Sequence, residues 1–221
     1  ISLCGFSFVL PSILVVYAVI KIYGYNGILN NYFNFYNFIQ IDTVYGLTGI
    51  LLAHIFLNAP FATRLFVQNL NNIPDKYYEI SKTLNLSFMG NIIKLEYPII
   101  KQNLFTVFSI IFSLCFLSFA IVMTLGGSPQ NSTLEVAIYQ YALFELNFQK
   151  AIILSFIQIF ICLVFVLIGF FSIKGSNFFE IEIKINVHPH KDIKLIKLFD
   201  IIVIIFFVVL LFSPISVLLF D

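Results

Sequence analysis

Residues 151–172 read AIILSFIQIFICLVFVLIGFFS, and no charged side chain interrupts this run. A helix needs roughly 20 consecutive apolar residues to cross the hydrocarbon core of a bilayer, so the run predicts one transmembrane helix. Every backbone N–H and C=O within the bilayer must be paired, which excludes an open sheet. The stretch therefore predicts an all-α fold that is embedded in a membrane.

Four further runs of similar length flank this stretch, at 3–23, 44–66, 104–125 and 199–220. Pro11 lies inside the first of them, and membrane helices tolerate proline because neighbouring groups pair with the freed carbonyl. The sequence thus predicts a bundle of about five transmembrane helices.

The composition supports this interpretation and excludes two classes of protein. Hydrophobic residues make up 60% of the chain and charged residues 10%, with a mean hydropathy of +1.00. Soluble domains carry about 25% charged residues, so this chain has too few to solvate a surface in water. The net charge of +1 provides no basic patch for nucleic acid. A multi-pass membrane protein is expected.

Basic residues predict the orientation of the bundle, because cytoplasmic loops are enriched in Lys and Arg. The loops at 24–43 and 126–149 have only Lys21 and Lys150 at their edges, and they are expected to face outward. The two remaining loops are expected to face the cytoplasm. They hold the other ten basic residues: Arg64, Lys76, Lys82, Lys94 and Lys101 in one, and Lys174, Lys184, Lys191, Lys194 and Lys197 in the other.

No group of residues suggests a metal site. Cys4, Cys115 and Cys162 all lie in apolar runs and are expected to be buried free thiols. His188 and His190 flank a proline without a third ligand nearby, which favours a solvated turn.

One amphipathic segment, YYEISKTLNLSFMGNIIKLEYP at 77–98, interrupts the apolar runs. A helix starting at Pro74 would place Tyr77, Ile80, Leu84 and Phe88 on one face. A turn is expected around 85–87, then a second short helix over about 88–96, with Pro98 at the return to the membrane. The segment could rest on lipid headgroups, but its mixture of acidic and basic residues favours docking to a protein.

The spacing of this segment resembles the "EAA" loop of binding-protein-dependent ABC importer permeases, which spans about 74–98 here. The family pattern has Glu-Ala-Ala, three residues, Gly, nine residues, an apolar residue, one residue and Leu-Pro. The matching positions here are Glu79, Ile80, Ser81, Asn85, Leu95, Tyr97 and Pro98. Several residues differ from those of the family pattern. Asn85 stands at the Gly position, and Asn, like Gly, tolerates left-handed turns. In that family the loop is the coupling helix, which is seated in a groove of the cytoplasmic ATPase subunit.

The stretches at 49–74 and 114–143 look like permeases of thiamine importers within this family, as does FVLPSILVVYAVIKIYGYNGIL near the start. Such permeases are similar in layout to two fused halves. The resemblance implies that residues 1–172 are part of a first half, 173–198 a cytoplasmic linker, and 199–221 the first transmembrane helix of a second half.

Polar side chains within the apolar runs are candidates for the solute path. His54, Asn58 and Gln158 are the clearest. Hydrogen bonding between helices is the alternative, and we favour it. The chain has no Gly-rich loop followed by Lys and Ser or Thr, so we expect it to bind no ATP and to perform no catalysis itself.

Together these observations predict a permease subunit of an ATP-driven importer in a bacterial inner membrane. The resemblance implies thiamine or its phosphates as the solute, an ATPase dimer that uses ATP and Mg, an external binding protein, and a second permease half from the same or a homologous chain. Ferric iron or another small solute is the alternative within this class. A multi-pass protein without a transport function is the alternative from another class.

Overall fold

The computed structural model describes residues 10–33, 44–127, 131–172 and 194–219, and its regular structure in these ranges is entirely helical. The all-α prediction is therefore confirmed. The elements in chain order are α2 (Ser12–Tyr23), α3 (Ile28–Phe33), α5 (Leu47–Asn71), α6 (Asp75–Thr83), α7 (Phe88–Asn91), the π-helical turn η1 (Ile92–Glu96), α8 (Tyr97–Phe116), α9 (Phe119–Leu125), α10 (Leu134–Tyr139), the π-helical turn η2 (Gln140–Phe144), α11 (Phe148–Phe171) and α12 (Lys194–Leu219).

Three of the described helical stretches are long and apolar enough to cross a membrane: Leu47–Asn71, Phe88–Phe116 and Phe148–Phe171. They correspond to three of the five expected spans. The fifth expected span lies in α12, a helix of 26 residues that begins at Lys194, inside the segment expected to be a linker. Positions 173–193 of that linker, with both of its histidines, lie outside the described residues.

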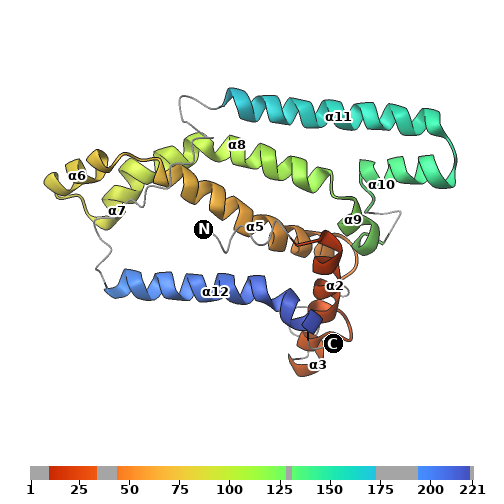
Figure 1. Ribbon diagram of the computed structural model, residues 1–221, viewed down its shortest axis with the longest axis horizontal. Coiled ribbons are helices and arrows are strands. Elements are labelled where there is room, and N and C mark those ends of the chain that lie inside the picture. The colour runs from red at the N-terminus through yellow and green to blue at the C-terminus, as the bar shows by residue number, and fades with distance from the viewer. Residues whose placement is uncertain (1–9, 34–43, 128–130, 173–193, 220–221) are drawn as a thin grey trace.

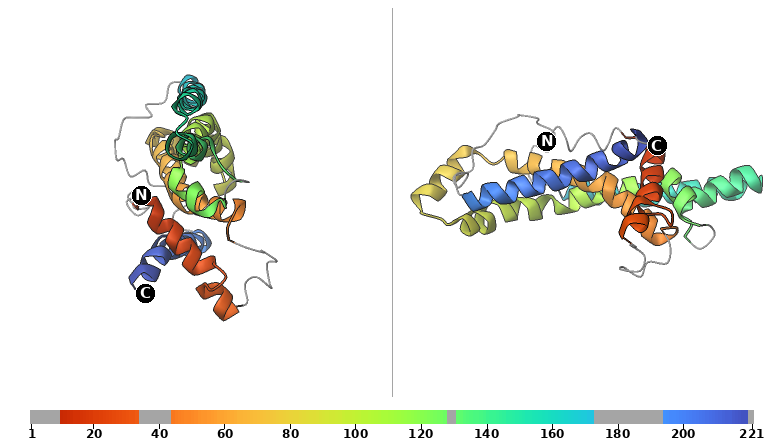
Figure 2. Two further views of the ribbon diagram at one scale, coloured as in Figure 1. Left: turned by 90° about the vertical axis from the view of Figure 1, so that its right-hand side faces the viewer. Right: turned by 90° about the horizontal axis from the view of Figure 1, so that it is seen from below.

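The first expected span differs from the prediction in its described part. Only α2 represents it, with 12 residues that start after Pro11, while residues 1–9 are outside the description. Figures 1 and 2 show α2 crossing α5 and α12 near their ends and not running beside them.

The long helices lie side by side, with α8 between α5 and α11, and α12 on the other side of α5 (Figure 1). The amphipathic α6 and α7 occupy one end of the bundle, where α12 begins. The opposite end holds α3, α9 and α10 (Figure 1). The basic segment from α6 to η1 and the described parts of the loops poor in basic residues, 24–33 and 131–147, therefore lie at opposite ends of the bundle.

The contact between α8 and α11 is close because small residues line it. Thr106 of α8 donates a hydrogen bond to the Gly169 carbonyl of α11 at 3.0 Å. A Cβ atom at Gly169 would lie 2.9 Å from both Cβ and Oγ of Ser109, so only glycine fits there. The stacked rings of Phe112 and Phe165 extend the contact, with centroids 3.9 Å apart. Such small-residue contacts are typical of helix pairs in membranes.

Large apolar side chains cover the outside of the bundle. Phe156 and Phe160 of α11 are 69% and 68% exposed, for example. The buried core is small by comparison and joins α2, α5 and α9 through Val15, Ala53 and Leu125. An apolar exterior of this extent favours lipid or a partner protein over water.

The predicted span at 104–125 is wrong in its second half. The helix α8 ends at Phe116, and Ser118 adopts an extended conformation with φ −82° and ψ 91° before α9 begins. Hydropathy could not indicate this break, because the residues on both sides of it are apolar.

Candidate functional site

The amphipathic segment starts with a tight turn at the end of α5. The Ile73 amide donates to the Leu70 carbonyl at 3.1 Å, and Pro74 is extended, with φ −61° and ψ 138°. Pro74 therefore stands just before the first residue of α6, where its missing N–H costs no hydrogen bond. The acidic Asp75 lies in the first turn and Lys82 in the last, which is the favourable arrangement for the helix dipole.

The helix α6 presents its apolar residues outward. Tyr77, Ile80 and Leu84 are 45%, 52% and 66% exposed, although they lie on one face. The buried residues of the helix are instead Tyr78 and Ser81. We call the exposed residues Tyr77, Ile80 and Leu84 the α6 face; Glu79 and Lys82, which are also exposed, flank it.

The turn after α6 depends on two of the predicted positions. Ser81 is 2% exposed, and its carbonyl accepts a hydrogen bond from the Leu86 amide at 3.0 Å. Asn85 has φ 50°, in the left-handed region that asparagine tolerates better than most residues. The predicted turn around 85–87 is therefore confirmed.

The second arm of the segment is not a separate short helix, in contrast to the prediction. Phe88, which was expected on the face of the first helix, begins α7 instead. Ser87 caps α7 by accepting a hydrogen bond from the Gly90 amide at 3.2 Å. The helix then continues through η1 into α8, and Pro98 sits at its start without a break. A proline inside an α-helix clashes with the carbonyl four residues earlier, and a π turn at that point removes the regular α spacing. Leu95 is half-buried within η1.

A hydrogen bond joins the two arms. The Tyr78 hydroxyl donates to Oε1 of Glu96 at 3.3 Å. Burial, the negative charge of Glu96 and this hydrogen bond together raise the pKa of Tyr78 to about 12, with burial as the largest cause. The phenol is therefore protonated at neutral pH and remains a donor. Sequence reasoning missed both residues, because neither belongs to the apolar pattern.

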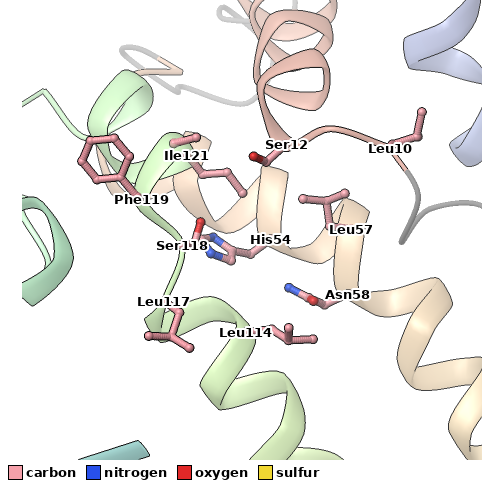
Figure 3. A pocket seen from close by; sticks show the side chains of 11 residues that line it. Leu10, Ser12, His54, Leu57, Asn58, Leu114, Leu117, Ser118, Phe119 and Ile121 are labelled. Carbon is pink, nitrogen blue, oxygen red and sulfur yellow. The ribbon is translucent and has the colours of Figure 1, made fainter. Parts of the chain in front are cut away.

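The structure brings His54 and Asn58 together and places Gln158 elsewhere. His54 and Asn58, one turn apart on α5, line a cavity of about 420 Å³ between α5 and the break after α8 (Figure 3). The Asn58 side chain donates to Sγ of Cys115 at 3.2 Å. Gln158 of α11 is buried and donates instead to Glu135 of α10. Glu135 was not predicted as its partner, because the residues around it were expected to face outward, beyond the apolar runs.

The described residues contain no group of three His, Cys, Asp or Glu side chains that could hold a metal ion.

Residues 2–176 match the family described as "Binding-protein-dependent transport system inner membrane component". The chain belongs to this family. It is therefore a membrane component of a transport system, as the spacing in 74–98 indicated.

The curated relatives of this permease chain include thiamine transport proteins. This chain is 39% identical over 216 residues to "Thiamine transport system permease protein ThiP" of Haemophilus influenzae. The aligned region covers 97% of this chain and 40% of the relative. The ThiP protein of Salmonella typhimurium is 35% identical over 76% of this chain and 32% of the relative. The "Probable sulfate transport system permease protein cysT" of Helicosporidium is 31% identical over 60% of this chain and 48% of the relative.

The chain thus spans well under half of the thiamine permeases that it matches. No solved structure matches it.

Proposed function

We propose that this chain is part of the permease of an ATP-driven importer for thiamine or its phosphates in a bacterial inner membrane. The observation that carries the proposal is the similarity over 97% of the chain to a thiamine transport permease. The relatives lend no support to a multi-pass protein without a transport function.

The α6 face is the proposed seat for a cytoplasmic ATPase subunit. It combines three exposed apolar side chains with flanking charges of both signs, Glu79 and Lys82. Interfaces that bind proteins have an apolar centre and a polar rim, which fits this arrangement better than the basic face of a lipid-bound helix. Each ATPase subunit of a pair needs one such seat, so a second permease half would supply the other.

The movement of α6 would reach the membrane through identified contacts. The Tyr78–Glu96 hydrogen bond ties α6 to η1, which continues directly into α8. The close approach at Gly169 then couples α8 to α11. When the ATPase pair closes on ATP with Mg, these helices would move as rigid bodies and expose the path to an external binding protein, and hydrolysis would reset them. The chain itself performs no covalent step.

Uptake of labelled thiamine tests the solute. The complete permease gene and the genes of its partners are expressed in cells that lack their own thiamine importer. We expect saturable, ATP-dependent uptake of thiamine, and an ATPase variant without hydrolysis serves as the control. Uptake of ferric iron or sulfate in place of thiamine would contradict the proposal. The similarity to the sulfate permease makes another small solute the second candidate.

A further inference from the structure

Polar groups from three parts of the chain line the cavity beside His54. Ser12 comes from α2, His54 and Asn58 come from α5, and Ser118 lies at the break between α8 and α9. Figure 3 shows the His54 imidazole extending from α5 toward this break. We propose that the cavity is a solute subsite, in which Nε2 of His54 accepts a hydrogen bond from an amino group on a flat heterocycle. The inference rests on the proposed import function and deepens it.

The hydrogen bonds of His54 fix which nitrogen can accept. Its Nδ1 lies 2.8 Å from the carbonyl oxygen of Ile50. A carbonyl only accepts, so Nδ1 carries the hydrogen and donates it. In the neutral imidazole Nε2 then holds a lone pair. Nε2 is buried and has no hydrogen-bond partner among the described residues. A buried acceptor without a partner costs free energy, which a solute N–H group would recover.

The walls of the cavity favour an uncharged ring over an anion. Among the described residues they contain no Lys, Arg, Asp or Glu, and they include the aliphatic side chains of Leu57 and Leu114 and the ring of Phe119. A phosphate would lose its hydration here without gaining a cation, which is costly. The volume of about 420 Å³ falls in the range of small-molecule sites. We therefore assign the ring, and not a phosphate group, to this cavity.

The break between α8 and α9 forms part of the cavity wall and relates the cavity to transport. Irregular backbone at membrane depth is tolerated where it lies in protein or lines a cavity. Ser118 interrupts the helical path there, and its side chain makes no capping hydrogen bond to α9. A relative movement of α5 and α8 would change the shape of this wall, so binding and release of a solute can follow the state of the bundle.

Two substitutions separate solute binding from a structural role of His54. His54→Asn keeps a donor near the Nδ1 position and can still bond the Ile50 carbonyl, as Asn103 does with Ile99 at 3.1 Å. It removes the acceptor at Nε2. His54→Gln places an amide oxygen near Nε2 instead. In the complete importer with its binding protein, we expect His54→Asn to raise the KM for thiamine uptake about fivefold, the effect of one neutral hydrogen bond. His54→Gln is expected to recover most of this loss. The opposite order would indicate a structural role and overturn the inference.

A second solute makes the test specific for the amino group. The probe is thiamine with its ring amino group replaced by hydrogen. For each importer, the KM for the probe is divided by the KM for thiamine. This ratio should be about fivefold larger for the unmodified importer than for His54→Asn. The binding protein is the same in both assays. Equal discrimination by both would overturn the subsite. No thiamine uptake by the unmodified importer would overturn the proposed function together with the inference.

Protection from chemical labelling provides a further test of the subsite that does not depend on the His54 variants. Ser118→Cys is introduced into an importer whose native cysteines are replaced. Thiamine at tenfold its KM should slow the reaction of this cysteine with a water-soluble thiol reagent, and the probe should slow it less. An unchanged labelling rate in saturating thiamine would contradict a solute subsite at this cavity.

Discussion

The two ends of α8 are built in opposite ways. At the α6 end, the helix runs without interruption from α7 through η1, and Glu96 holds Tyr78 of α6. At the other end, α8 stops at Phe116 and a two-residue break leads to α9 beside the cavity. Under the proposed function, a push on α6 would travel along the uninterrupted helix and end at the break beside the cavity. The predictions below test each part of this difference.

The largest effect is expected from a charge on the α6 face. Ile80→Asp places a carboxylate at the centre of its exposed apolar side chains. We expect loss of co-purification with the ATPase subunit and loss of uptake, because an unpaired charge at the centre of an interface is strongly unfavourable. Pull-down and uptake assays measure both.

Tyr25→Asp provides the matched control for this substitution. Tyr25 is 76% exposed and lies in the turn between α2 and α3, and α3 is at the opposite end of the bundle (Figure 1). If Ile80→Asp bound the ATPase as well as Tyr25→Asp does, the α6 face would not be the seat. Charge reversal at Lys82 is expected to act in the same direction as Ile80→Asp but more weakly, since rim charges contribute less.

The close packing of α8 and α11 gives the next largest effect. Gly169→Ala would place a Cβ 2.9 Å from Ser109 Cβ, so the helices must separate. We expect a loss of about 1–3 kcal/mol in the free energy of unfolding. Unfolding in detergent, followed by circular dichroism, measures it.

The double variant Gly169→Ala/Ser109→Gly tests the cause of that loss. Removing the Ser109 Cβ relieves the clash, at a cost of about 1 kcal/mol for glycine inside a helix. The two substitutions should therefore be non-additive. Additive losses would show that this contact does not hold α8 against α11.

The hydrogen bond between the arms should have a smaller effect. Tyr78→Phe removes the donor to Glu96 and keeps the ring. We expect a loss of about 1 kcal/mol in the free energy of unfolding and less thiamine imported per ATP hydrolysed, because α8 would follow α6 less closely. Measuring uptake and hydrolysis in the same vesicles gives this ratio. An unchanged ratio would show that this hydrogen bond takes no part in coupling ATP hydrolysis to uptake.

The smallest effect is expected at alkaline pH. The pKa of Tyr78 is about 12, against 10.0 for the free side chain. The folded protein therefore retains this proton to a higher pH than the unfolded chain does. The contribution to stability is therefore complete below pH 10 and is lost as the pH rises toward 12. Other groups titrate there too, so the measurement is the difference in stability between the unmodified protein and Tyr78→Phe. A difference that stays constant from pH 9 to 12 would contradict the assignment.

The sequence predicted the helical membrane class and the amphipathic segment because both depend on local patterns. Continuous apolar runs mark α5 and α11, and Pro74 and Asn85 mark the start of α6 and the turn that follows it. The break at Leu117–Ser118 and the passage of the helix through Pro98 were missed, because tertiary packing and a π turn decide them. The pairs Tyr78–Glu96 and Gln158–Glu135 join residues that are 18 and 23 positions apart, and no periodicity in the sequence indicates such contacts.

The most direct test of the account asks whether the α6 face controls the cavity. Ser118→Cys is labelled with a thiol reagent in the assembled importer, with and without ATP, once with the native α6 face and once with Ile80→Asp. We predict that ATP changes the labelling rate when the face is intact and leaves it unchanged when Ile80 is replaced. An equal response to ATP in both proteins would contradict the claim that α6 transmits the movement of the ATPase to the broken end of α8.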